Sequence, residues 1–160
     1  MATTFRSFAI LSLLLGISAI LPDRAAAAPP TDACALLTPA QIGTALGVTM
    51  AAGVPVTPTV RTSCKWLESG VDSMKAKTVI ISIKSVQAYE MGKLATGGRL
   101  QMTPVSGIGD EAYMTSGTIS YGATLSVKKS GAAFTVTVRG YPDVPTIQDK
   151  DKALARQITF

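Results

Sequence analysis

The C-terminal part of the chain alternates between apolar and polar residues, and this pattern constrains the fold more than any other feature. In Ala132–Arg139 the two classes occupy opposite sides of an extended chain: Phe134, Val136 and Val138 on one side, Thr135, Thr137 and Arg139 on the other. Such alternation predicts a strand with one buried face. The residues Lys129-Ser130-Gly131 are typical of a tight turn, so Ser120–Lys128 is expected to pair with this strand as a hairpin.

Further strands are expected upstream. Val60–Glu68 alternates in the same way, and Cys64 and Trp66 fall on its apolar face. Thr78–Ser85 and Glu111–Ser116 also have strand composition. Val48–Pro58 contains two prolines and is expected to be an extended connection or an edge strand, whereas Pro104–Gly109 is expected to be a loop.

Three helices are predicted between and around these strands. Thr38 fits an N-cap, with Pro39 at the first helical position and Gln41 completing a capping box, and Gly47 ends this first helix after Leu46. A second helix begins after Ser85 and stops at Gly97-Gly98, and a terminal helix carries Ile147, Leu154 and Ile158. The predicted fold class is α+β, with a single antiparallel sheet of about five strands in the order α-β-β-α-β-β-β-α. Helices are expected to cover one face of the sheet, which leaves the other face polar.

The N-terminus has the architecture of a secretion signal. A basic start, the apolar run Phe8–Leu21 and a cluster of alanines predict cleavage after Ala27. An uncleaved anchor is the alternative, but the run is shorter than the ~20 residues of a spanning helix. The expected organisation is a signal peptide at 1–27, a linker at 28–33 and one domain at 34–160. We expect a periplasmic or extracellular protein with no stable membrane insertion after cleavage.

The chain contains two cysteines, Cys34 and Cys64. An even number of cysteines in an exported chain predicts a disulfide. A loop of about 30 residues closed in this way would contribute roughly 3–4 kcal/mol of stability.

The charge pattern disfavours nucleic acid as a partner. The formal net charge is +5, but the basic residues are scattered, and only Lys128 and Lys129 are adjacent. Nucleic-acid binding domains usually carry a clustered basic patch.

No catalytic or metal-binding group emerges from the sequence, and no cofactor is predicted. The chain has no histidine, and both cysteines are expected in the disulfide. The pattern Gly107-Ile108-Gly109-Asp110-Glu111-Ala112 matches a dinucleotide fingerprint, but its strand-like surroundings indicate a structural turn. The serine–lysine neighbours Ser82/Lys84 and Lys128-Lys129-Ser130 are interpreted as a solvated face, and Asp149 and Asp151 as part of an exposed helix face.

The polar side of the last hairpin is the candidate binding face. Its strongest members are two hydroxyls, two cations and a tyrosine: Ser126, Lys128, Thr137, Arg139 and Tyr141. Thr124, Thr135 and Tyr121 extend the set. Such a face can bind a protein, a glycan or an acidic polymer, although a solvated sheet has the same composition.

Several short segments share a pattern with known proteins: Cys34-Ala35-Leu36-Leu37-Thr38, Leu46-Gly47, Cys64-Lys65-Trp66 and Gly107-Ile108-Gly109-Asp110-Glu111-Ala112-Tyr113. Together they resemble a group of exported bacterial domains of unknown function, many of which are lipoproteins. The resemblance implies an α+β fold and the Cys34–Cys64 disulfide, and it implies no activity. This chain lacks the lipidation cysteine of the lipoprotein members.

The sequence therefore predicts an exported cell-envelope protein that acts as a non-enzymatic binding or structural module. Its partner would be an envelope protein, a glycan or an acidic polymer. The alternative is a small exported hydrolase that uses carboxylates or a serine–lysine pair.

Overall fold

The computed structural model describes residues 28–94, 100–117 and 122–160. The expected signal peptide, the helix stop at Gly97-Gly98 and Tyr121 lie outside the described residues. The described chain contains a short 3-10 helix, three α-helices and seven strands. In chain order they are η1 (Ala33–Ala35), α1 (Pro39–Leu46), β1 (Val54–Thr57), β2 (Val60–Leu67), β3 (Thr78–Lys84), α2 (Val86–Leu94), β4 (Leu100–Val105), β5 (Glu111–Gly117), β6 (Ala123–Lys129), β7 (Ala132–Arg139) and α3 (Val144–Gln157).

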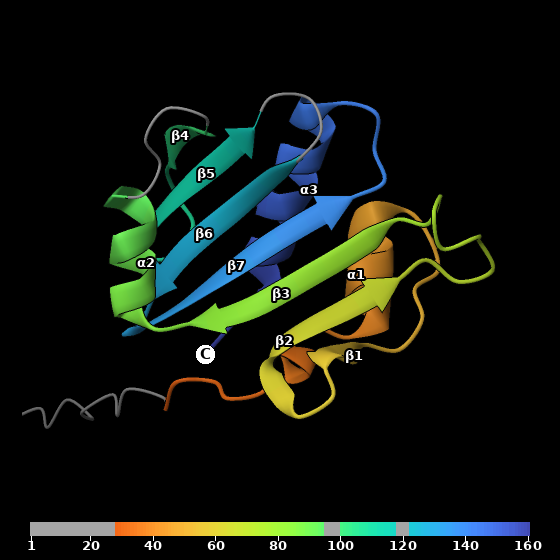
Figure 1. The fold of residues 1–160 in the computed structure, drawn as a ribbon, viewed down its shortest axis with the longest axis horizontal. Helices are drawn as coiled ribbons and strands as arrows, with labels where there is room; N and C mark the ends of the chain where they lie inside the picture. Colours follow the sequence, from red (N-terminus) through yellow and green to blue (C-terminus); the bar gives the residue numbers. More distant parts are fainter. Residues whose placement is uncertain (1–27, 95–99, 118–121) are drawn as a thin grey trace, which may run out of the picture.

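These strands form one antiparallel sheet in the order β1-β2-β3-β7-β6-β5-β4 (Figure 1). The sheet consists of two meanders, β1-β2-β3 and β4-β5-β6-β7, with α2 as the connection between them. The last strand of each meander lies at the centre, where β3 pairs with β7 from Thr78↔Arg139 to Lys84↔Ala133. The predicted α+β class and single antiparallel sheet are confirmed.

The predicted number of strands and their order are wrong, because the sheet has two further strands at its edges. An edge strand was one of the two alternatives expected for Val48–Pro58. Val54–Thr57 of the segment that contains Pro55 forms edge strand β1. Residues 100–105 form β4 at the opposite edge, and this strand runs through Pro104, where a loop was expected. An edge strand tolerates proline because one side of its backbone needs no ladder hydrogen bond.

Helices α1 and α3 cover one face of the sheet, here called the inner face, and lie behind the strands in Figure 1. The alternating apolar residues of the strands point to this face, as predicted. The largest fully buried side chains form a single core: Trp66, Phe134, Leu37, Ile42, Ile81, Leu125, Leu154 and Ile158. Burial of each such side chain contributes about 1.5–3 kcal/mol.

Helix α2 lies on the opposite face, here called the outer face, so the expectation that helices cover one face only is wrong. The buried Tyr89 of α2 packs against Tyr113 and Ala133, whose side chains point away from the core. The helix begins immediately after β3, where the Ser85 hydroxyl accepts a hydrogen bond from the Ala88 N–H. It covers one end of the outer face and leaves the rest open (Figure 1).

The first helix and the disulfide form as the sequence predicts. The Thr38–Gln41 capping box is complete, and Gly47 ends α1 in the left-handed conformation at φ 77°. The sulfur atoms of Cys34 and Cys64 are 2.00 Å apart, which confirms the disulfide. It joins the start of the domain to β2. Within the described residues, no helix is long and apolar enough to cross a membrane.

Asp151 corrects a further prediction. Its side chain was expected on an exposed helix face, but it is fully buried, whereas Asp149 is exposed. The physical reason is helical spacing: Asp151 falls on the same stripe of α3 as Ile147 and Leu154, which face the core.

Candidate functional site

A row of hydroxyl side chains crosses the outer face of the sheet. Strand pairing places Ser63 opposite Ser82, Ser82 opposite Thr135, Thr135 opposite Ser126, and Ser126 opposite Tyr113. The hydroxyl oxygens of Ser63 and Ser82 are 2.7 Å apart and share a hydrogen bond. Here this row is called the hydroxyl row. It spans five neighbouring strands, β2, β3, β7, β6 and β5.

A parallel row of threonines lies beside it. Thr137, Thr124 and Thr115 occupy neighbouring positions on β7, β6 and β5. The hydroxyl oxygens of Thr124 and Thr137 are 2.9 Å apart, and the Thr115 hydroxyl donates to the Thr124 carbonyl oxygen at 3.2 Å. These bonds hold the threonine side chains in fixed orientations, so the face presents ordered polar groups.

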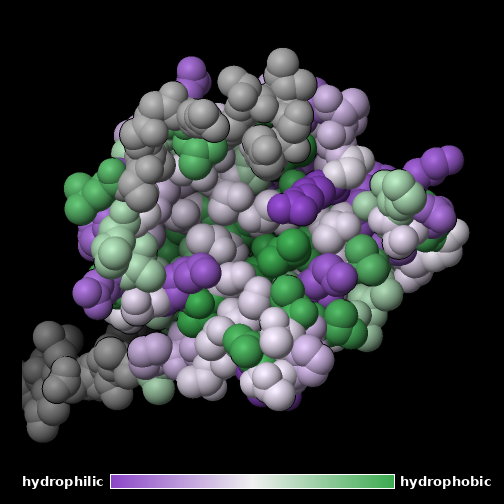
Figure 2. Space-filling view, viewed as in Figure 1, coloured by the Kyte–Doolittle hydropathy of each residue, from purple (hydrophilic) through white to green (hydrophobic). Residues whose placement is uncertain are grey.

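Three cations on the open part of the outer face have no carboxylate partner among the described residues. They are Lys65 on β2, Lys84 at the end of β3 and Arg139 at the end of β7. Lys65 pairs in register with Ile80, which pairs with Thr137, and Arg139 lies two residues further along β7. Figure 2 shows this face, where hydrophilic residues are interspersed with pale and apolar ones.

A cluster of alternating charges borders α2. Lys128 Nζ lies 2.7 Å from Glu90 Oε1 and 2.8 Å from Glu111 Oε2. Lys93 pairs with the same two carboxylates, at 3.5 Å from Glu90 Oε2 and in close contact with Glu111. These four residues, here called the charge cluster, tie α2 to β5 and β6.

The charge cluster also fixes the protonation states of its members. Hydrogen bonds to Glu111 and then Glu90 raise the pKa of Lys128 above its ordinary value. The same bonds lower the pKa values of both carboxyl groups, with Lys128 as the largest cause for each. Neither the lysine nor the carboxylates are therefore tuned to exchange protons near neutral pH.

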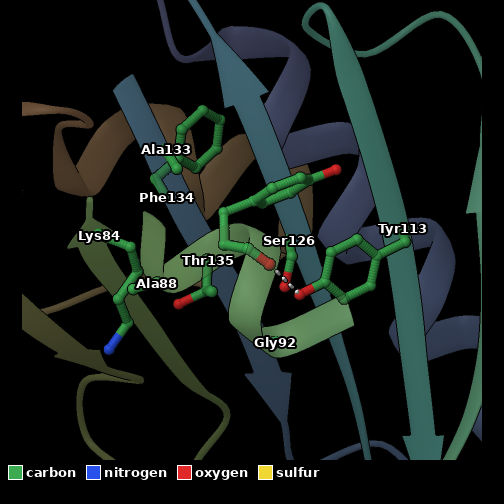
Figure 3. Close-up of a pocket in the computed structure, with 9 residues that line it drawn as sticks. Lys84, Ala88, Gly92, Tyr113, Ser126, Ala133, Phe134 and Thr135 are labelled. Carbon is green, nitrogen blue, oxygen red and sulfur yellow. Dashed lines mark hydrogen bonds between the residues drawn. The ribbon is translucent and has the colours of Figure 1, made fainter. Parts of the chain in front are cut away.

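A pocket lies where α2 overhangs the sheet, with a cavity volume of about 230 Å³ (Figure 3). Strands β5, β6 and β7 contribute Tyr113, Ser126 and Thr135 to its lining, and Lys84 lies at its edge. Ser126 is 7% exposed. The pocket therefore continues the hydroxyl row beneath the helix.

Tyr89 separates the pocket from the charge cluster. Its ring centre lies 5.0 Å from that of Tyr113 and 5.4 Å from Lys128 Nζ. Its hydroxyl is buried with no hydrogen-bond partner among the described residues. Burial is the main cause that raises the pKa of Tyr89 to about 12. The phenol thus stays neutral and supplies an apolar wall.

The structure does not bring the five predicted site residues together on one open surface. Thr137 and Arg139 lie on the open outer face, whereas Ser126 is covered by α2 and Lys128 belongs to the charge cluster. Tyr141 packs against the inner core, where its hydroxyl donates to the Leu46 carbonyl oxygen at 3.0 Å. Strand alternation correctly predicted that the four residues on β6 and β7 point away from the core, but it could not show that α2 covers part of this face.

Residues of α2 were missed as site residues. Tyr89 and Glu90 approach the sheet only because the helix crosses the outer face. The one local signal in the sequence was the pair of small residues Ala88 and Gly92, four positions apart, which allows the helix to lie close to other groups. A Cβ atom at Gly92 would lie 2.5 Å from the Tyr113 hydroxyl oxygen.

The serine–lysine neighbours make separate contacts. Ser82 is hydrogen-bonded to Ser63, and the Lys129 ammonium donates to the Ile158 carbonyl oxygen at 2.7 Å. The Ser130 N–H donates to Asp110 at the end of the hairpin. Among the described residues, no group of three or more carboxylate, cysteine or histidine side chains is placed to hold a metal ion.

Searches of protein-family models, curated proteins and solved structures found no match to this chain.

Proposed function

We propose that this protein is an exported, non-enzymatic module of the bacterial cell envelope that binds an acidic polysaccharide on the outer face of its sheet. The observation that carries the proposal is that three cations on this face are not paired with carboxylates. Lys65, Lys84 and Arg139 lack carboxylate partners in the described part of the chain, whereas Glu90 and Glu111 of the charge cluster are neutralised by lysines. The open face therefore offers positive charge to a ligand.

The spacing of the cations favours an extended ligand over a small anion. Lys65 is two strands and two residues from Arg139, or about 12 Å between backbones at normal sheet spacings. Lys84 is four residues from Ile80, the register partner of Lys65, and thus lies about 14 Å away. One small anion cannot contact all three, but a polymer with repeated carboxylates can.

The hydroxyls between the cations favour a sugar polymer over an acidic peptide. The hydroxyl row and the threonine row present both donors and acceptors. Sugar hydroxyl groups can pair with each of them, whereas the carboxylates of an acidic peptide only accept. The signal sequence and the disulfide support a role outside the cytoplasm.

The hydrolase alternative needs a group that exchanges protons, and the contacts at the candidate site oppose it. Lys128 is held protonated, and Glu90 and Glu111 are held ionised. A binding module has no such requirement.

Binding of the exported chain to polygalacturonate, measured by isothermal titration calorimetry, tests the proposal. We expect binding that weakens with added salt, and no binding to neutral dextran. The double variant Lys65→Gln/Arg139→Gln should lose roughly tenfold in affinity, because two exposed ionic contacts are removed. Lys75→Gln/Arg156→Gln removes the same charge from exposed residues elsewhere and should bind normally.

Two results would reject this function. Equal effects of the two double variants would show that only net charge matters. Equal binding of polyglutamate would show that the face does not select sugars.

A further inference from the structure

The pocket beneath α2 has the size of one substituted six-membered ring. Its volume is about 230 Å³. A dry cavity of about 150 Å³ accommodates benzene. Small residues form part of its lining: Ala88 and Gly92 on the helix and Ala133 on β7.

The pocket lining combines flat apolar walls with hydroxyl groups. Tyr89 and Tyr113 supply rings, and Ser126 and Thr135 supply hydroxyls from the sheet. Lys84 at the edge has no carboxylate partner among the described residues. In Figure 3 the side chains of Tyr113, Ser126 and Thr135 come from three neighbouring strands and lie beneath α2, whereas Lys84 lies apart from them at the side of the pocket. Aromatic walls, hydroxyls and a single cation together match a sugar ring that carries one carboxylate.

Tyr113 and Tyr89 are in contact where the hydroxyl row reaches β5. The Tyr113 hydroxyl donates to the Tyr89 carbonyl oxygen at 3.4 Å, and the two rings pack at 5.0 Å. At the other end the row continues onto the open face through Ser82 and Ser63. A polymer that lies along the open face would therefore enter the pocket with its terminus.

We propose that this pocket binds the terminal hexuronate residue of the acidic polysaccharide, with its ring between α2 and the sheet and its carboxylate at Lys84. This inference rests on the proposed function, since the rest of the polymer would lie along the open face. The pocket selects the chain end, and Lys65 and Arg139 hold the chain that follows.

The first experiment titrates the exported protein with galacturonate, galactose and benzoate, followed by NMR chemical shifts. We expect galacturonate to bind and to shift resonances of residues that line the pocket. Galactose lacks the charge and benzoate lacks the hydroxyl groups, so both should bind more weakly. Benzoate binding as tight as that of galacturonate would overturn the assignment to a sugar.

Matched variants locate the binding. Ala88→Leu fills the pocket from an exposed position on α2 and should abolish galacturonate binding, whereas Gln87→Leu, one residue away and outside the lining, should not. Thr135→Val removes one lining hydroxyl and should weaken binding about fivefold, the effect of one hydrogen bond. Thr103→Val, on edge strand β4 and outside both the pocket and the two rows, is its control. The Thr135 pair gives an independent answer if Ala88→Leu perturbs folding.

The proposal for the pocket and the proposal for the open face can be rejected separately. Unchanged galacturonate binding in both Ala88→Leu and Thr135→Val would overturn the pocket proposal. Polygalacturonate binding that survives this result, and is still weakened by Lys65→Gln/Arg139→Gln, would leave the proposed function standing. Galacturonate binding in the pocket without any polymer binding would overturn the proposed function and the chain-end assignment. Absence of binding by both probes would overturn both proposals.

Discussion

Asp151 of α3 accepts a hydrogen bond at 2.8 Å from the backbone N–H of Val138, in the interior of the protein. Val138 pairs with Val79 of β3, but the register pairs of β7 with β6 end at Leu125 and Val136, so Val138 lies beyond the β6–β7 ladder. The carboxyl group of Asp151 therefore replaces a missing strand partner. Its second oxygen has no partner among the described residues, and burial raises the pKa of Asp151 to about 8.

This buried carboxyl predicts that the protein becomes less stable as the pH rises from about 5 to 8. The folded state keeps Asp151 protonated, whereas the unfolded chain ionises it above about pH 4, so its contribution is complete at low pH and is lost toward pH 8. The free energy of unfolding should fall by up to about 1.4 kcal/mol per pH unit in this window. Urea denaturation at several pH values measures the slope.

The variant Asp151→Asn is the control, because it keeps an acceptor for the Val138 N–H and cannot ionise. Its stability should be nearly constant between pH 5 and 8. Other carboxyl groups have lowered pKa values and act in the opposite direction at lower pH, so they do not mask the effect: Asp32, Glu68, Glu90, Glu111 and Asp143. The same slope in the wild type and the variant would contradict the assignment to Asp151.

The disulfide gives a second prediction. Cys64 is fully buried on β2, and its bond to Cys34 closes a loop with a sequence separation of 30. The double variant Cys34→Ala/Cys64→Ala should lower the free energy of unfolding by about 2–5 kcal/mol. Titration of the unfolded, unreduced wild type should detect no free thiols. Two thiols per chain would show that the bond does not form in the protein.

The sequence predicts the centre of the fold better than its edges. β7 and β2 alternate between apolar and polar residues because one face is buried, and this period is visible without a structure. β4 is exposed along nearly its whole length, so no burial pattern marks it. Its assignment depends on pairing with β5, which is a long-range contact.

The same limit applies to the candidate site. Alternation correctly assigned Lys128 and Ser126 to the side away from the core. It could not show that α2 lies across the outer face. The two sides of this helix differ little in hydrophobicity, and its single buried residue is Tyr89. The ion pairs of the charge cluster join residues that are 18 and 38 positions apart in the sequence. Local sequence patterns therefore do not predict these contacts.

Export gives a third prediction. The signal architecture predicts a mature N-terminus at Ala28. The structure adds a reason against lipidation at Cys34, because a sulfur in a disulfide cannot also carry a thioether-linked lipid. Mass spectrometry of the protein from its native host should find a chain that begins at Ala28. An intact Met1, or a lipid on Cys34, would disprove the predicted cleavage of a signal peptide before Ala28.

The turn before β5 gives the fourth prediction, from two glycines with the same backbone conformation and different surroundings. Gly107 and Gly109 have φ values of 75° and 61°. A Cβ atom at Gly107 would meet nothing within 4 Å, whereas one at Gly109 would lie 2.5 Å from the Lys128 carbonyl oxygen. That carbonyl also accepts a hydrogen bond from the Asp110 N–H at 2.8 Å, so the turn cannot move away without breaking its contact with β6.

Gly107→Ala should therefore cost about 1 kcal/mol, the penalty for a side chain in the left-handed region. Gly109→Ala should cost roughly 2 kcal/mol more, because a backbone clash is added to the same penalty. It should also disturb the charge cluster, since the backbone it displaces belongs to Lys128. Thermal unfolding of both variants measures the difference, and NMR shifts of Lys128 and Glu111 measure the local change. Equal stabilities would show that the turn does not pack against β6 as described.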